Sequence, residues 1–279
     1  MRPYSLVGQI ATTIALLLWM MLGLFPLYWM LVLAFQEGTL VLKLPPNWFP
    51  NPRTLGNFRM ALSDPMIPRW FINSIFVSSV TTLGTVLSCA LAGYIFAKLR
   101  FPGREVLFYV VLAMMLMPGQ LTMIPLYMLV VRLGWLNNYA GIIVPAWASA
   151  FGIFLMRQFF RTIPTEMLES AQIDGCTALR TFWHILLPLA RPGLAVLSIF
   201  TFIGTWNDFL WPLIILNKEK LYTIQLGVAR ITMGYSGGGQ AKPGLGMASA
   251  LLAALPCFVF FFAFQRFFLE GLTLGALKG

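Results

Sequence analysis

Long apolar windows dominate the sequence, and short polar segments separate them. Most of the windows are close to the length of about 20 residues that an α-helix needs to cross a bilayer. In lipid, backbone polar groups must be satisfied inside the spanning element, which favours helices. The windows predict about six transmembrane helices, at residues 8–35, 70–97, 105–128, 139–157, 192–216 and 246–267. We therefore expect an all-α, polytopic membrane protein whose residues 1–279 form a single transmembrane domain.

Two of these windows contain residues that interrupt a helix. In the third, Met117-Pro118-Gly119 and then Pro125 predict a break near the outer end, because proline cannot continue the helical hydrogen bonds. A short helix over about 121–133 is expected to follow along the outer surface. The fourth window opens with the polar pair Asn137-Asn138, so its helix is expected to begin near Tyr139.

The composition agrees with lipid as the main solvent. The chain is 59% hydrophobic and 10% charged, whereas a soluble domain carries about 25% charged residues. Basic loops beside the helices explain the formal net charge of +10, so no nucleic-acid partner is expected. The uncharged stretch after Arg2 is too long for a signal-peptide core of about 7–15 residues. We expect it to be retained as the first helix.

Residues that bind metals or form disulfides are scarce. The three cysteines, Cys89, Cys176 and Cys257, are far apart and form no CxxC pair, and the one histidine is His184. This pattern implies neither a disulfide framework nor a zinc site. We expect no metal site, no catalytic residue and no cofactor in this chain.

Positive charges suggest the orientation in the membrane. An even number of spans places both termini on one side, and the totals of Lys and Arg on the two sides are nearly equal. The short loop after the second window, however, contains Lys98, Arg100 and Arg104. Because short basic loops remain in the cytoplasm, we expect both termini to be cytoplasmic.

Small residues form one stripe along the second window, at steps of three and four. They are Ser74, Ser78, Thr82, Thr85, Cys89 and Gly93. Small side chains allow helices in membranes to approach closely, so the stripe predicts packing inside the bundle. The alternative is that it lines a polar pathway.

The segment 158–190, between the fourth and fifth windows, is longer than a simple connector requires. It mixes charged and apolar residues, which predicts one or two short amphipathic helices. A turn is expected at Asp174-Gly175, because glycine permits left-handed backbone. An amphipathic element of this kind is suited to docking into a groove on a partner.

This segment carries a spaced motif. It reads Glu169-Ser170-Ala171-Gln172-Ile173-Asp174-Gly175-Cys176, followed by Phe182, Ile185 and Leu187-Pro188. The motif resembles the EAA loop of binding-protein-dependent ABC importer permeases. It departs from the family pattern at Ser170 and Cys176, where alanine is usual, and both replacements are small.

Four further segments resemble carbohydrate permeases of the maltose-transporter type, in particular their smaller, six-helix subunit. They are Ile72-Asn73-Ser74, Lys98-Leu99-Arg100-Phe101-Pro102-Gly103, Phe202 with Trp206-Asn207-Asp208, and the C-terminal residues from Gly271 to Gly279. The resemblance covers nearly the whole chain. It implies a multi-pass permease in the bacterial plasma membrane that carries a sugar, a polyol or another sugar-like solute.

The resemblance also implies partners. They are a second, related permease that completes a heterodimer, two cytoplasmic ATPase subunits that bind ATP and Mg, and an extracytoplasmic solute-binding protein. The residues expected to couple this chain to the ATPase are Glu169, Ala171, Ile173, Asp174, Gly175, Phe182 and Ile185. Of these, Ile173, Phe182 and Ile185 are expected to be the apolar anchors. The tail from Gly271 to Gly279 is expected to insert between the ATPase subunits.

The only acid well inside a predicted span is Asp208, beside Trp206 and Asn207. A carboxylate in lipid is costly, so Asp208 should face the bundle or a wet cavity. Trp206 could stack on a sugar ring, and Asn207 and Asp208 could bond its hydroxyl groups. The structural alternative is that Asp208 holds a neighbouring helix or the partner permease.

Two other classes of function, a membrane enzyme and a secondary transporter or channel, fit the sequence less well. The chain has no G-x-x-x-x-G-K-[ST] phosphate loop, so it cannot supply the ATP site itself. A membrane enzyme would need paired acids or a nucleophile with its base inside the spans. A secondary transporter or channel could use six helices but would not need the spaced motif in 158–190.

Overall fold

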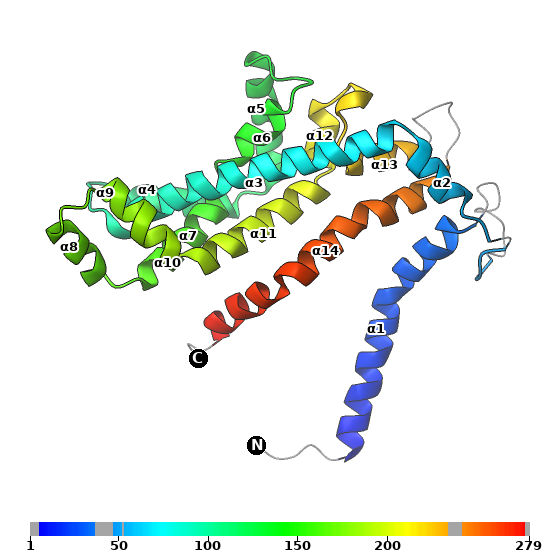
Figure 1. Cartoon of the computed structure of the whole chain (residues 1–279), viewed down its shortest axis with the longest axis horizontal. Helices are drawn as coiled ribbons and strands as arrows, with labels where there is room; N and C mark the ends of the chain where they lie inside the picture. Colours follow the sequence, from blue (N-terminus) through cyan, green and yellow to red (C-terminus); the bar gives the residue numbers. More distant parts are fainter. Residues whose placement is uncertain (1–5, 37–46, 52, 234–241, 277–279) are drawn as a thin grey trace. The chain divides into compact units, whose positions relative to one another are not determined.

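The computed structural model describes residues 6–36, 47–51, 53–233 and 242–276 (Figure 1). These residues fall into two compact units. The first comprises Met1–Pro68 and Gly227–Leu255, and the second comprises Arg69–Leu226 and Pro256–Gly279. The single domain expected over 1–279 stays a prediction.

The described residues form helices, and their one β feature is an isolated bridge between Gln36 and Arg53. The helices are α1 (Leu6–Ala34), α2 (Gly56–Ser63), α3 (Met66–Lys98), α4 (Arg104–Leu116), α5 (Gly119–Arg132), α6 (Ala140–Ala146), α7 (Ala150–Thr162), α8 (Glu166–Ile173), α9 (Ala178–Thr181), the π-helical turn η1 (Phe182–Leu186), α10 (Leu187–Leu189), α11 (Arg191–Asn207), α12 (Leu210–Ile215), the 3-10 turn η2 (Glu219–Leu221), α13 (Ile224–Thr232) and α14 (Pro243–Ala276).

Three helical stretches of the described chain are long and apolar enough to cross a membrane. They are Gly8–Ala34, Met66–Lys98 and Ala140–Thr162. Two bent pairs, α4 with α5 and the segment Ala178–Leu189 with α11, raise the number to five. The sixth predicted window, 246–267, lies inside α14. These helices are consistent with an all-α polytopic membrane protein.

The third window is two helices rather than the single span 105–128. The chain bends by 105° between α4 and α5. The break lies at Met117-Pro118, as predicted, with Met117 in an extended conformation (ψ 126°). A residue before proline is disfavoured in helical conformation, which accounts for the end of α4.

The fifth window, 192–216, is also interrupted. Asp208 was expected within a continuous helix, but α11 ends at Asn207 and Asp208 is extended (ψ 124°). The Asp208 Oδ1 accepts a hydrogen bond from the Trp211 backbone N–H at 3.3 Å. Asp208 thereby satisfies one of the backbone N–H groups in the first turn of α12, which begins at Leu210 after Phe209.

The end of the chain also differs from the prediction. Helix α14 continues past the predicted window 246–267 and through Gly271 to Ala276, so most of the predicted C-terminal tail is helical. The last three residues, 277–279, lie outside the described part.

In the first unit, α2 is joined to the end of α1 by a buried amide. The Asn57 Nδ2 donates to the Ala34 carbonyl at 3.0 Å and to the Gln36 carbonyl at 2.7 Å. Most of the apolar side chains along α1 are exposed, Trp19 among them. A helix of this length and composition is suited to contact with lipid.

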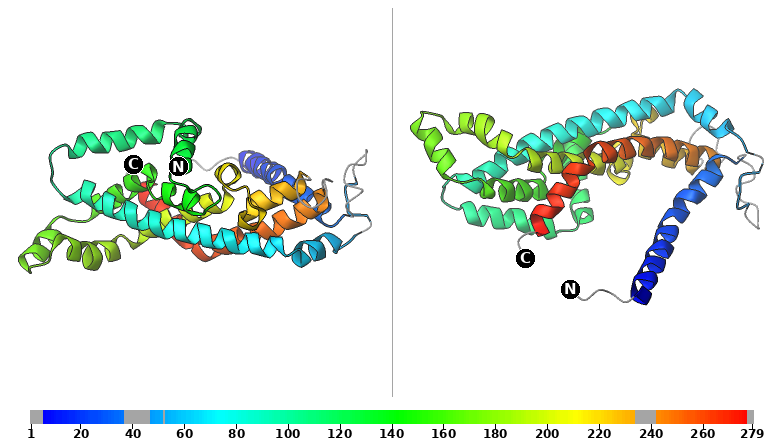
Figure 2. Two further views of the ribbon diagram at one scale, coloured as in Figure 1. Left: turned by 90° about the horizontal axis from the view of Figure 1, so that it is seen from above. Right: turned by 60° about the horizontal axis from the view of Figure 1, so that its bottom comes forward.

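In the second unit, α3 is the longest helix, and α8–α10 gather near its C-terminal end (Figures 1 and 2). The small-residue stripe on α3 packs against neighbours, as predicted. Thr85 Oγ1 donates to the Ala146 carbonyl at 3.1 Å, and the Ser74 hydroxyl accepts from the Ile224 N–H at 2.8 Å. A Cβ at Gly93 would lie 2.6 Å from the Met156 Cβ. The close approach of α3 and α7 therefore requires glycine at this position.

A charged cluster joins α4 to α7. The Arg157 guanidinium is 6% exposed and contacts both Glu105 carboxylate oxygens, at 3.1 and 3.0 Å. It also lies over the Phe108 ring, 3.7 Å from the centroid, and donates to the Phe96 carbonyl at 3.2 Å. Sequence reasoning treated Glu105 and Arg157 only as ends of windows. The sequence did contain a signal for this ion pair, because an acid begins the third window and an arginine ends the fourth.

We predict that Gly93→Ala destabilises the protein. The added methyl group meets the backbone N of Arg157 at 2.9 Å as well as Met156, so α3 and α7 must separate. Overpacking of this kind costs about 1–3 kcal/mol. The measurement is thermal unfolding in detergent. Gly204→Ala is the matched control, since nothing lies within 4 Å of its Cβ position. Equal unfolding temperatures for the two variants would contradict the prediction.

We also predict that Arg157→Lys lowers the unfolding temperature by several degrees. Lysine keeps the charge but cannot bond two carboxylate oxygens, stack on Phe108 and reach the Phe96 carbonyl together. The control is Arg161→Lys, because Arg161 is exposed on the same helix. If both variants unfold at the wild-type temperature, the cluster does not hold α4 to α7.

Candidate coupling segment and a polar cavity

The segment between α7 and α11 contains the spaced motif, and it turns where the sequence predicts. Helix α8 ends at Ile173, and Gly175 has a left-handed backbone (φ +76°). The Cys176 N–H donates to the Ala171 carbonyl at 2.9 Å, and the Gly175 N–H donates to the Gln172 carbonyl at 3.0 Å. This is a glycine cap that satisfies the last carbonyls of a helix. It reverses the chain between α8 and α9.

Helix α7 continues to Thr162, so the predicted segment 158–190 begins within that helix. The remaining residues 163–190, called the coupling segment below, have an inner and an outer side. Leu168, Ala171 and Phe182 are buried within the chain. In contrast, Ile173 is 86% exposed and Leu179 is 62% exposed. An apolar side chain exposed on a polar element marks a surface that suits a partner.

The seven predicted coupling residues are distributed over both sides of the segment. Glu169, Ile173, Asp174 and Gly175 are exposed, Ile185 is partly buried, and Ala171 and Phe182 are buried. Ile173 therefore points out, while Phe182 anchors the segment to its own chain. The spacing of apolar residues could not distinguish an exposed Ile173 from a buried Phe182, because burial depends on which helices the segment packs against.

Three aromatic rings hold the inner side in place. The Phe182 ring stacks on Tyr94 of α3, with 5.5 Å between centroids, and lies 6.4 Å from the ring of Phe160 on α7. The Tyr94 hydroxyl donates to the Ala178 carbonyl at 3.4 Å. Aromatic pairs in this distance range stabilise beyond the area they bury. The same buried cluster includes Leu168 of α8 and Leu197 of α11.

The link from α9 to α10 is a π-helical turn. The Leu187 N–H donates to the Phe182 carbonyl, five residues earlier. Both ends of the turn, Phe182 and Leu186, are fully buried. Single π turns occur frequently at functional sites. The sequence contained no signal for this turn, since it results from fitting two buried side chains into one core.

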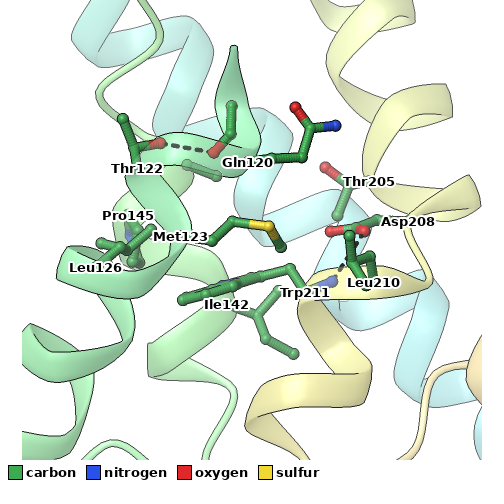
Figure 3. A pocket seen from close by; sticks show the side chains of 12 residues that line it. Gln120, Thr122, Met123, Leu126, Ile142, Pro145, Thr205, Asp208, Leu210 and Trp211 are labelled. Atoms are coloured by element: carbon green, nitrogen blue, oxygen red, sulfur yellow. Dashed lines mark hydrogen bonds between the residues drawn. The ribbon is translucent and has the colours of Figure 1, made fainter. Parts of the chain in front are cut away.

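A second feature of this unit is a cavity of about 380 Å³ between α5, α6, α11 and α12 (Figure 3). Its lining residues are Gly119, Gln120, Thr122, Met123, Leu126, Ile142, Pro145, Ala146, Thr205, Asp208, Leu210 and Trp211. Figure 3 shows the polar groups of Gln120, Thr205 and Asp208 together on one side. Met123, Ile142 and Trp211 lie beside and below them.

The indole N–H of Trp211 and the hydroxyl of Thr122 are already hydrogen-bonded within the chain. The Trp211 Nε1–H donates to the Gly141 carbonyl at 3.0 Å, and the Thr122 hydroxyl donates to the Gly119 carbonyl at 2.8 Å. Trp211 therefore presents its ring, not its N–H, to the cavity. Sequence reasoning did not single out Gln120, Thr205 or Trp211. The break near Asp208 and the packing of α5 and α6 against α11 and α12 depend on tertiary structure.

The three predicted pathway residues have different environments. Trp206 is fully buried, with Phe71 edge-on at 5.3 Å and Phe202 stacked at 6.0 Å between centroids. Its ring is enclosed, so the stacking on a sugar expected of Trp206 is not available in this structure. Asn207 is exposed and accepts from Gln225 Nε2 at 3.3 Å. Of the three, Asp208 lines the cavity.

No group of three or more His, Cys, Asp or Glu side chains in the described residues could hold a metal ion. Cys89, Cys176 and Cys257 are free thiols.

The family model for the "Binding-protein-dependent transport system inner membrane component" matches residues 84–273. The arabinooligosaccharides transport system permease protein AraQ of Bacillus subtilis (strain 168) is 31% identical over 280 residues, which is 99% of this chain and 98% of that protein. The sn-glycerol-3-phosphate transport system permease protein UgpE of Salmonella typhi is 34% identical over 256 residues, 90% of each chain.

Among solved structures, the chain is similar to one from a bacterial ABC transporter involved in the import of the acidic polysaccharide alginate. The TM-score is 0.84 at 22% identity, over 96% of this chain and all (100%) of that one. At this identity the likeness concerns the fold. Together with the family match over residues 84–273, these findings establish that the chain belongs to the binding-protein-dependent transport system inner membrane components.

Proposed function

We propose that this chain forms half of the translocation pathway for a sugar or sugar-like solute in an ATP-driven importer, and that the coupling segment links it to an ATPase subunit. The observation that carries this proposal is the two-sided coupling segment. Its inner side is fixed by Phe182 in the core, and its outer side exposes Ile173.

The outer side has the chemistry of a docking surface. Ile173 supplies an exposed apolar side chain, and Glu169 and Asp174 lie near it on α8 and its cap. A partner groove with an apolar pocket and basic or polar rims would complement this face. Gly175 keeps the turn compact, and nothing lies within 4 Å of its Cβ position in the described chain.

The partners follow from family membership. We propose a heterodimer with a second, related permease, two ATPase subunits that bind ATP and Mg, and an extracytoplasmic solute-binding protein. A solved alginate importer of similar fold (TM-score 0.66, 16% identity) is described in complex with a periplasmic protein that binds an alginate pentasaccharide. That similarity supports a solute-binding protein as one partner.

The solute class is supported by the relatives. One is named for arabinooligosaccharides and another for sn-glycerol 3-phosphate. Both solutes are polyhydroxylated and small enough to pass between helices. We therefore propose a sugar, polyol or related compound as the cargo of this chain.

We further propose that the protein lies in the bacterial plasma membrane with both termini in the cytoplasm. The basic loop after α3 lies at the same end of the second unit as the coupling segment, since the Lys98 Nζ donates to the Ile163 carbonyl at 2.5 Å. The positive-inside rule and the expected position of an ATPase therefore favour the same side.

A secondary transporter or channel is the other function considered. It would carry solute without an ATPase and would have no use for the exposed face of α8. Co-purification of an ATPase with the chain from native membranes separates the two functions.

We predict that Ile173→Arg releases the ATPase while the permease stays folded, because Ile173 makes little contact with its own chain. Loss of an interface anchor costs about 2 kcal/mol or more, which is about a 30-fold loss in affinity. The measurements are ATPase retention on the affinity-purified permease and uptake by cells.

The matched control is Leu62→Arg, at an apolar residue of α2 that is also largely exposed. It should retain the ATPase. Full retention and normal uptake with Ile173→Arg would rule out α8 as the docking surface.

A further inference from the structure

We propose that the cavity lined by Gln120, Thr205, Asp208 and Trp211 is a subsite for an uncharged polyhydroxy solute. This inference rests on the proposed function and restricts its substrate class. Relatives of the chain are named for neutral and for anionic solutes, so family membership leaves the charge of the cargo open.

The size and the two-sided lining of the cavity fit a sugar ring. Its volume of about 380 Å³ lies in the range of about 300–1,000 Å³ that is usual for small-molecule sites. A sugar has hydroxyl groups around its edge and C–H groups on its faces. Gln120, Thr205 and Asp208 would meet the edge, and Trp211 and Met123 would meet a face (Figure 3).

The polar side retains unused bonding capacity. The Asp208 carboxylate accepts from the Trp211 N–H through Oδ1. An ionised carboxylate has about four acceptor positions, so Asp208 can accept further donors. The Gln120 amide offers donors and an acceptor, and the Thr205 hydroxyl offers one donor. Hydroxyl groups both donate and accept hydrogen bonds, so side chains that together do both can bind them.

The lining includes one carboxylate, that of Asp208, and no Lys, Arg or His. A phosphate or carboxylate solute would bring a second negative charge beside Asp208 without a compensating cation. Like charges placed together in a partly dry site repel strongly and serve to exclude wrong ligands. The cavity therefore selects against anionic solutes and accepts neutral ones.

The cavity also connects with the coupling segment through one helix. Helix α11 packs against α10 and α7, and it ends at Asn207, beside Asp208. Its residue Leu197 belongs to the buried cluster that holds Phe182. A change at the docking face can thus reach the polar side of the cavity through a continuous rigid element.

The test uses the assembled importer in lipid nanodiscs, with Cys176 and Cys257 replaced by serine and Cys89 left in the core. Leu126→Cys places a thiol on the cavity wall at a lining residue with no assigned solute contact, and maleimide labelling reports its accessibility. The neutral probes are arabinotriose, sorbitol and glucosylglycerol, and the anionic probe is sn-glycerol 3-phosphate. At about ten times its Kd, a bound solute should slow labelling about tenfold, because only the empty site reacts.

We expect at least one neutral probe to protect Leu126→Cys and the anionic probe to leave its labelling unchanged. An added positive charge gives the second arm: in Gln120→Arg, the cation should allow sn-glycerol 3-phosphate to protect. The matched reporter is Ser63→Cys, exposed on α2 and outside the lining, which no probe should protect.

Three results would overturn the subsite. They are absence of labelling at Leu126→Cys, which would mean that a partner fills the cavity; labelling that no neutral probe slows; and equal protection by the anionic probe without Gln120→Arg. Failure of the proposed function is distinguishable, since it appears as absence of ATP-dependent uptake for every sugar-like solute.

Discussion

The burial of Phe182 is the interaction on which the rest of the second unit depends. Its ring joins Tyr94 of α3 and Phe160 of α7, and the same cluster includes residues of α8 and α11. Removing a buried phenylalanine side chain typically costs about 3–5 kcal/mol. In this protein, removing the Phe182 ring would also release the coupling segment from α3 and α7, the helices that it would move under the proposed function. The cluster therefore makes the docking face and the membrane helices one packed body.

The exposed face around Ile173 and the cavity beside Asp208 lie on opposite sides of this cluster, and one mechanism can connect them. Under the proposed function, the exposed Ile173 would contact the ATPase partner, and the cavity beside Asp208 would hold a solute. Helix α11 connects them, because it leaves the coupling segment at Arg191 and ends at the cavity. Packed cores are bistable rather than softly deformable, so a shift at one end is transmitted as a rigid displacement.

Much of this organisation could be predicted from the sequence, and for definite reasons. The break at Met117-Pro118 was predictable because proline restricts the residue before it. The turn at Gly175 was predictable because glycine permits a left-handed backbone, and Gly175 has φ +76°.

The features that were missed depend on tertiary packing. The burial of Trp206 depends on Phe71, which is far from it in the sequence, and the same tryptophan could have faced a pathway if α3 had lain elsewhere. The end of α11 at Asn207 is accompanied by a hydrogen bond from the Trp211 N–H to Asp208, and a single acid inside an apolar window is a weak local signal for such a break. The π-helical turn at Phe182 results from two side chains that share one core.

The most direct test of this mechanism is a distance measurement within the second unit. Spin labels at Gln172→Cys on α8 and Leu83→Cys on α3, both exposed positions, report the position of the coupling segment by double electron–electron resonance in the assembled importer. We predict one narrow distance distribution that ATP does not change, and a broad one when Phe182→Ala is added. A wild-type distance that shifts with ATP, or a distribution that stays narrow in Phe182→Ala, would contradict the rigid connection.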